Sequence, residues 1–141
     1  MNPNGLLSSL PGQISDDSVL SQLLGRKTAE VAVAEAAQAF FVAGIVETSD
    51  QAPVLVVTPT ANDAEMLSND LKVWLGADQV GVFPAWETLP FERVSPGIET
   101  MGQRLDLLNC LKEGHSPEVV VAPIRALLQR LTPDAPDIAF L

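Results

Sequence analysis

Hydrophobic residues along this chain alternate between short unbroken runs and longer stretches with a helical period. Valine-rich runs of this kind are typical of strands buried on both faces of a parallel sheet. The runs are residues 53–58, 79–83 and 118–122. Apolar side chains that recur every three or four residues predict amphipathic helices between them. These helical stretches are residues 15–25, 28–43, 60–76 and 95–114. The alternation predicts an α/β fold, a parallel sheet with flanking helices.

Residues with strong local preferences place the ends of these elements. Thr60 and Asp63 have the spacing of a capping box, and glycine at position 76 closes that helix. Gly44 is expected to end the helix 28–43. Ser95, followed by a proline, is expected to begin the helix 95–114, and Pro123 is expected to open a last short helix. We expect the buried stripe of the helix 95–114 to consist of Met101, Leu105, Leu108 and Leu111, with Cys110 at the core or its boundary.

Length and composition favour one domain in a reducing compartment. The 141 residues suit a single domain, which we expect at 15–131, between a flexible tail at 1–14 and the start of a linker at 132–141. The single cysteine excludes an internal disulfide. No apolar run reaches the roughly 18–20 residues that span a bilayer, and the first residues carry no positive charge. We therefore expect a cytoplasmic protein with no membrane contact.

The charge balance bears on nucleic-acid binding. The chain has 18 acidic and 8 basic residues and a formal net charge of −10. A nucleic-acid-binding surface needs basic residues that neutralise phosphates. Tight DNA binding by this chain alone is therefore not expected. His115 and Cys110 lack partners at metal-ligand spacing, so no metal site is predicted either.

In open parallel sheets, ligands bind outside the carboxyl ends of the strands. This rule selects Thr58 and Thr60, the connection 83–97, and Arg125. A phosphate-binding loop needs G-x-x-x-x-G-K-[ST] after a strand. Lys27 and Thr28 supply its last two positions.

Serine and arginine stand at positions 21 and 26, where that motif requires glycine. An arginine side chain would occupy the space in which backbone must approach phosphate. We therefore interpret the nucleotide motif as degenerate and expect no catalytic residue. Lys27, Thr28, Thr58, Thr60 and Arg125 remain candidates for vestigial nucleotide or DNA contacts.

The connection 83–97 is about fifteen residues long, whereas most connections in compact domains have roughly 4–6. Long ordered loops often carry function. Its aromatic and apolar side chains suit packing on the domain's own core or contact with a partner, and both interpretations stay open. Arg93 in this connection and Arg104 are expected to form ion pairs with Glu87, Glu92 or Glu99. The candidate interaction residues are Trp86, Glu87, Leu89, Pro90, Phe91, Arg93 and Arg104.

Four segments together resemble one protein family. They are Val-Leu-Val-Val-Thr-Pro-Thr at 54–60, Trp-Glu-Thr-Leu-Pro at 86–90 with Ser-Pro at 95–96, Gly-Gln-Arg-Leu-Asp-Leu-Leu at 102–108, and Val-Val-Val-Ala-Pro-Ile-Arg at 119–125. The chain from about Leu20 to Leu131 resembles the N-terminus of the bacterial transcription-repair coupling factors, the Mfd family, and most of all their actinobacterial members. The resemblance implies a degenerate RecA-like, P-loop NTPase-like fold similar to domain 1a of the excinuclease protein UvrB, incomplete relative to the full protein.

The resemblance also implies a role. The chain would be a non-catalytic module in nucleotide excision repair of transcribed strands, helping to recruit the excinuclease protein UvrA, mainly through the domain that follows it. Other domains of the same chain would be partners too, and RNA polymerase and DNA would be bound through the parent protein. No cofactor is expected here, because ATP and magnesium belong to the downstream motor. The alternative is the front half of an active superfamily 2 helicase or UvrB excinuclease domain that binds ATP and DNA.

Overall fold

A computed structural model provides the structure of the chain. It describes residues 10, 22–23, 25–49, 53–86 and 97–129. The helix expected at 15–25, the tail 1–14 and the segment 132–141 lie largely or wholly outside these residues.

The described part is an α/β structure built on a three-stranded parallel sheet. The strands are β1 (Val54–Thr58), β2 (Val80–Val82) and β3 (Val119–Pro123), in the spatial order β1-β3-β2. The helices are α3 (Gln38–Thr48), α4 (Ala61–Leu75), α5 (Ile98–Glu113) and α6 (Ile124–Leu128), with short 3-10 turns at Glu35–Ala37 and Ala77–Gln79. The fold class predicted from the sequence is thus confirmed, and β3 is the central strand.

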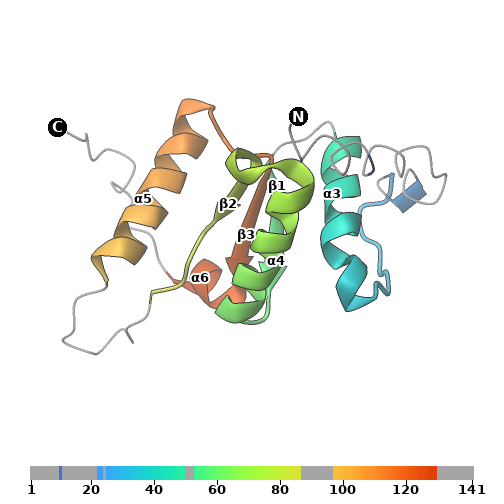
Figure 1. Cartoon of the computed structure of the whole chain (residues 1–141), viewed down its shortest axis with the longest axis horizontal. Coiled ribbons are helices and arrows are strands. Elements are labelled where there is room, and N and C mark those ends of the chain that lie inside the picture. Colours follow the sequence, from blue (N-terminus) through green and yellow to red (C-terminus); the bar gives the residue numbers. More distant parts are fainter. Residues whose placement is uncertain (1–9, 11–21, 24, 50–52, 87–96, 130–141) are drawn as a thin grey trace.

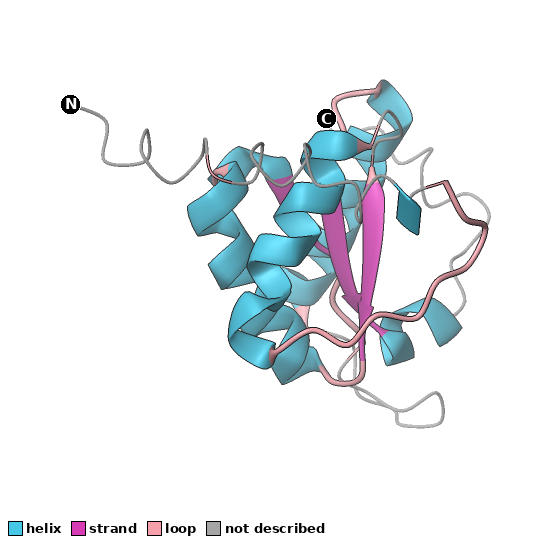
Figure 2. Cartoon of the chain, turned by 90° about the vertical axis from the view of Figure 1, so that its right-hand side faces the viewer, coloured by secondary structure: helices cyan, strands magenta, loops and turns pink. Residues whose placement is uncertain are grey.

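Helices lie on both sides of the sheet. In Figure 1, α3 and α4 lie to one side of the strands and α5 lies to the other, and Figure 2 shows the strands side by side behind the helical layer. The core on the α3–α4 side contains the buried residues Ala39, Ala43, Val46, Ala64, Leu71, Val80, Val119 and Val121. The core on the other side contains Phe83, Leu107, Val120, Ala122 and Ala126.

Helix α4 has the ends that the sequence predicts. The backbone N–H of Asp63 donates to Thr60 Oγ1 at 3.1 Å, and the N–H of Thr60 donates to Asp63 Oδ2 at 3.2 Å. This reciprocal pair is a capping box, and it satisfies two backbone donors at the helix start. Gly76 follows the helix with φ of 100°, a conformation that favours glycine.

The apolar face of α4 is also as expected. Leu71 is fully buried, and Leu67 and Trp74 pack against the same core. The rings of Phe40 and Trp74 lie 5.0 Å apart at 54°, so an aromatic contact joins α3 to α4.

The expected burial of β1 on both faces is wrong. Leu55 and Val57 are 53% and 45% exposed, whereas Val54 and Val56 pack against the α3–α4 core. In the sheet register Leu55 lies opposite Val120, on the face that α5 and α6 cover. These two helices contact β2 and β3, and β1 is an edge strand, so the outer part of this face is left open.

The helix expected at 28–43 is observed as α3, which begins later and ends later than expected. Residues 28–34 have no regular secondary structure, and α3 continues past Gly44 to Thr48. Most of the residues before position 37 are exposed, so no packed face stabilises a helix there. Gly44 itself is buried within α3.

The buried stripe of α5 is also shifted. Its buried residues are Thr100, Arg104 and Leu107, and Leu108 packs beside them. Met101 and Leu111 are exposed, contrary to expectation, and so is Cys110. The helix begins at Ile98 with Gly97 at the N-cap position, so it starts after Ser95 and the following proline, which lie outside the described residues. The shift follows from Arg104, whose side chain lies inward where a hydrophobic pattern would not place it.

Gly81 allows α5 to approach the sheet closely. A Cβ atom at this position would lie 2.8 Å from Leu107 Cδ1 and 2.9 Å from Pro117 Cγ. Both distances are shorter than normal van der Waals contacts, so a side chain would push α5 and the turn before β3 away from β2.

Gly81→Ala is therefore expected to destabilise the fold by about 1–3 kcal/mol, the usual cost of overpacking a close contact. Gly102→Ala is the matched control, because a Cβ there meets nothing within 4 Å on the helix α5. The control is expected to be neutral or to stabilise by up to about 1 kcal/mol. Urea unfolding followed by circular dichroism measures both. Equal stability of the two variants would contradict the close packing at Gly81.

Candidate functional site

Arg104 holds the beginning of the long connection against α5. Its side chain is 1% exposed. The guanidinium carbon lies 4.0 Å from the ring centre of Phe83 and 4.5 Å from that of Trp86. One guanidinium nitrogen, Nη1, donates to the carbonyl oxygen of Pro84. A planar cation that stacks on aromatic faces satisfies part of its charge without a carboxylate.

Gln129 fixes the same segment from the end of α6. The backbone N–H of Trp86 donates to Gln129 Oε1 at 2.7 Å, and Gln129 Nε2 donates to the carbonyl oxygen of Trp86 at 3.3 Å. The side-chain amide thus binds both backbone groups of one residue, as a neighbouring strand would. Residues 43 positions apart in the sequence are joined by this pair.

Burial leaves the guanidinium of Arg104 only partly satisfied. Within the described part of the chain, its Nε and Nη2 atoms have no hydrogen-bond acceptor. Burial removes solvent from the guanidinium and so lowers the pKa of Arg104 below its usual value. Arginine titrates so far above neutrality that the group keeps its charge. A buried cation therefore lies where the long connection leaves the sheet.

The candidate interaction residues are only partly visible. The structure brings Trp86 and Arg104 together, whereas Glu87, Leu89, Pro90, Phe91 and Arg93 lie outside the described residues. An ion pair of Arg104 with Glu99 is not formed, since the contacts of Arg104 in the described part are two rings and a carbonyl. Phe83 and Gln129 complete the arrangement, and neither was singled out from the sequence. Gln129 has no sequence signal, because its role depends on where α6 ends.

Of the residues proposed for vestigial nucleotide or DNA contacts, two threonines form hydrogen bonds within the fold and one arginine is exposed. Thr58 is buried, and its hydroxyl donates to the carbonyl oxygen of Thr60 at 2.9 Å. The Thr60 hydroxyl belongs to the capping box and lies 2.8 Å from Asp63 Oδ2. Arg125 is exposed on α6.

Lys27 and Thr28 do not lie in a strand-to-helix loop. Residues 25–27 form a turn and a bend, and residues 28–34 have no regular structure. A phosphate-binding loop instead joins a strand directly to the N-terminus of a helix, whose free N–H groups hold the phosphates.

The described residues also bear on metal binding and on membrane insertion. Among them, no group of three or more His, Cys, Asp and Glu side chains is arranged to hold a metal ion. None of the helices found there has both the length and the apolar character needed to cross a membrane.

Comparison with known proteins gives one consistent result. Over 89 residues, 59% of this chain, the sequence is 44% identical to the transcription-repair-coupling factor of Mycobacterium tuberculosis. It is 33% identical over 124 residues, 88% of this chain, to that of Haemophilus influenzae, and 32% identical over 81 residues, 57% of this chain, to that of Bacillus subtilis. No family profile matches the chain.

The chain belongs to the transcription-repair coupling factor family. It spans only 7–10% of the length of these relatives. The resemblance noted in the sequence is thereby confirmed. The identity to the mycobacterial protein is higher than the identity to the Haemophilus protein, in agreement with the actinobacterial character of the sequence.

The stacked arrangement of Arg104 in this family member can be tested with Arg104→Lys. Lysine keeps the charge but neither stacks as a plane nor donates in a fixed fork. We expect the variant to lose about 1.5–3 kcal/mol of unfolding free energy, as for a hydrogen bond to a charged group. In a Trp74→Phe background the remaining tryptophan fluorescence is that of Trp86. Acrylamide should quench it more strongly when residue 104 is lysine than when it is arginine.

Arg125→Lys is the matched control, because Arg125 is exposed. It should stay within about 0.5 kcal/mol of the parent, as surface substitutions usually do. If Arg104→Lys were as stable as the control and equally protected from quenching, the stack would have no structural role.

Proposed function

We propose that the chain is a non-catalytic module of a transcription-repair coupling factor, and that it helps to recruit the excinuclease protein UvrA to stalled RNA polymerase. The observation that carries the proposal is the 33% identity over 88% of this chain to a protein of that name. Coupling of repair to transcription is the role that this name states. The module would work as a scaffold, with any ATP and magnesium held by a downstream motor of the parent protein.

The geometry around the degenerate nucleotide motif supports a non-catalytic role. In the described residues 28–34, directly after Lys27, no helix begins, whereas in ATP sites a helix N-terminus at this point holds the phosphates. Position 26 is arginine, and both Lys27 and Thr28 are exposed. A side chain at position 26 would stand where phosphate must approach the backbone.

The surface chemistry supports a protein partner over a nucleic acid. The hydroxyls of Thr58 and Thr60 are bonded within the fold, so neither is directed to a phosphate. The formal net charge of −10 repels a polyanion at physiological salt. We therefore assign DNA and RNA polymerase contacts to the parent protein and contact with other protein domains to this module.

The alternative is the front half of an active helicase-like domain that binds ATP and DNA. The observation that favours it is the parallel sheet, with Thr58 at the carboxyl end of β1 and Arg125 shortly after that of β3. The two proposals differ in whether this chain binds nucleotide.

Titration with ATP and Mg²⁺ separates them. We expect no saturable heat or fluorescence change up to about 1 mM ATP, the upper end of usual substrate affinities. The double variant Lys27→Ala, Thr28→Ala is the control, and it should behave like the parent. Saturable binding that this double variant loses would support the alternative and refute a degenerate motif.

Capture of UvrA tests the positive part of the proposal. Under this proposal the main recruitment surface belongs to a domain that would follow this one in the parent protein. We therefore expect the present chain to retain UvrA at least about tenfold more weakly than a chain that includes that domain, a difference of about 1.4 kcal/mol. Equal capture by both would place the recruitment surface on the present chain.

A further inference from the structure

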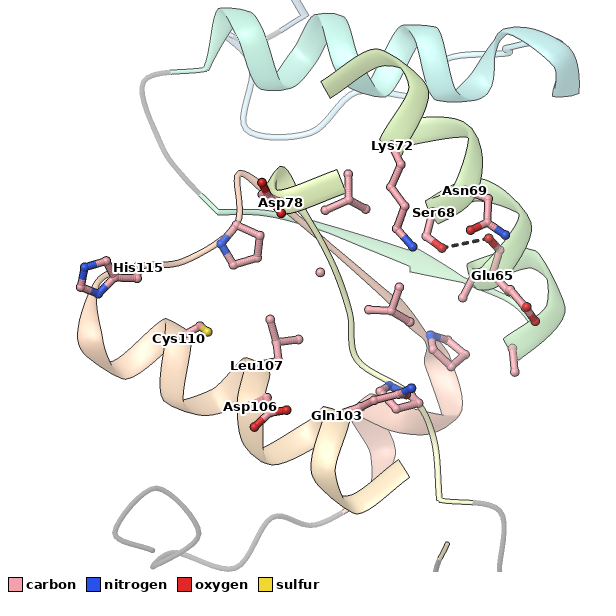
Figure 3. A pocket seen from close by; sticks show the side chains of 18 residues that line it. Glu65, Ser68, Asn69, Lys72, Asp78, Gln103, Asp106, Leu107, Cys110 and His115 are labelled. Carbon is pink, nitrogen blue, oxygen red and sulfur yellow. Dashed lines mark hydrogen bonds between the residues drawn. The ribbon is translucent and has the colours of Figure 1, made fainter. Parts of the chain in front are cut away.

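A groove runs along the free edge of the sheet at β2, between α4 and α5. Its volume is about 700 Å³, within the range of ligand-binding clefts. The strand β2 forms its floor. In Figure 3, Lys72 reaches down from α4 toward this strand and Leu107 rises toward it from α5, and Asp106 of α5 also lines the groove.

The floor of the groove presents backbone groups of β2 that have no hydrogen-bond partner among the described residues. The N–H of Phe83 donates to the carbonyl oxygen of Val121 at 2.9 Å, so Phe83 directs its backbone toward β3. Successive residues of a strand direct their backbone groups to alternate sides, and Gly81 therefore also bonds toward β3. Val80 and Val82 direct theirs into the groove. Among the described strands β2 has β3 as its neighbour and none on the groove side.

The open stretch of this edge is short and sharply bounded. The next residue directed outward is Pro84, which has no N–H, and its carbonyl oxygen already accepts from Arg104. Short edges that end at proline are protected from indiscriminate pairing. An added strand would pair with the outward backbone groups of Val80 and Val82, so its side chains must supply much of the selectivity.

The walls of the groove favour a positively charged segment. Carboxylates of Glu65, Asp78 and Asp106 line it, against the single ammonium of Lys72. A second copy of this chain would bring the same carboxylates and a formal charge of −10 to the contact. Like charges placed together across an interface are unfavourable, whereas lysine or arginine side chains complement these walls.

We propose that the β2 edge binds an extended, basic segment of a partner polypeptide, which adds a short fourth strand to the sheet. This is recognition by strand addition, in which backbone hydrogen bonds give affinity and alternate side chains give specificity. The partner's basic side chains lie against Glu65 and Asp106. With so few backbone bonds the affinity is modest, with Kd of about 0.1–1 mM for an isolated peptide.

The test is an NMR titration of the full chain, labelled with ¹⁵N, with a blocked heptapeptide of alternating valine and threonine that has a lysine at each end. We expect saturable shifts at Val80, Val82 and Asp106. N-methylation of alternate peptide nitrogens removes the donors and should weaken binding at least about tenfold. Glutamate in place of the two lysines should weaken it about fivefold or more.

Variants test the same edge from the protein side. Val82→Pro deletes the N–H that points into the groove while keeping the bonds to β3, and it should abolish the peptide shifts. Val57→Pro is the matched control, because Val57 directs its N–H to the opposite edge, at β1. It should bind as the parent does. Asp106→Lys changes an exposed residue and should reverse the preference between the lysine and glutamate peptides.

Four results would each overturn the proposal. They are the absence of saturable shifts, equal binding of the N-methylated peptide, an unchanged charge preference in Asp106→Lys, and shifts that gather at β1. Circular dichroism checks that both proline variants fold. If Val82→Pro does not fold, the N-methylated peptide and Asp106→Lys still decide the question.

Discussion

The arrangement of this domain depends on a buried arginine. Arg104 lies on the face of α5 that packs toward the sheet, where desolvation of a cation is costly. The cost is offset by the faces of Phe83 and Trp86 and by the carbonyl oxygen of Pro84. These three residues are consecutive or nearly so in the chain, so the arginine determines how the backbone leaves β2. Gln129 then secures Trp86 from α6.

The same contact explains why α5 lies where it does. The helix must approach the sheet closely enough for Arg104 to reach the end of β2, and Gly81 provides the space under Leu107 and Pro117. A close approach over β2 leaves β1 uncovered on that face, which is why Leu55 and Val57 are exposed. The location of one helix thus accounts for both a tightly packed half and an open half of one sheet face.

Much of the fold follows from local sequence. The valine runs become parallel strands, and the Thr60–Asp63 spacing becomes a capping box, because strand preference and helix capping act over a few residues. Burial of Leu55 depends on the position of β1 in the sheet. A run of apolar residues predicts a strand but does not indicate whether that strand is central or at an edge. The inward position of Arg104 depends on aromatic rings some twenty positions away in the chain. The hydrophobic pattern does not contain this information, and it therefore predicted Met101 and Leu111 as part of the buried stripe of α5.

The candidate site shows the same division between local and distant causes. Spacing alone indicated that Lys27 and Thr28 lack the glycines of a phosphate loop, and the structure places no strand-to-helix turn around them. The hydroxyls of Thr58 and Thr60, at the edge where ligands bind in related folds, instead bond to the backbone and to a carboxylate of their own chain. A hydroxyl committed in this way stabilises the turn into α4 and is no longer directed to a phosphate. Polar residues at the carboxyl end of a parallel sheet can therefore persist for the stability of the turn, and their presence there does not by itself indicate nucleotide chemistry.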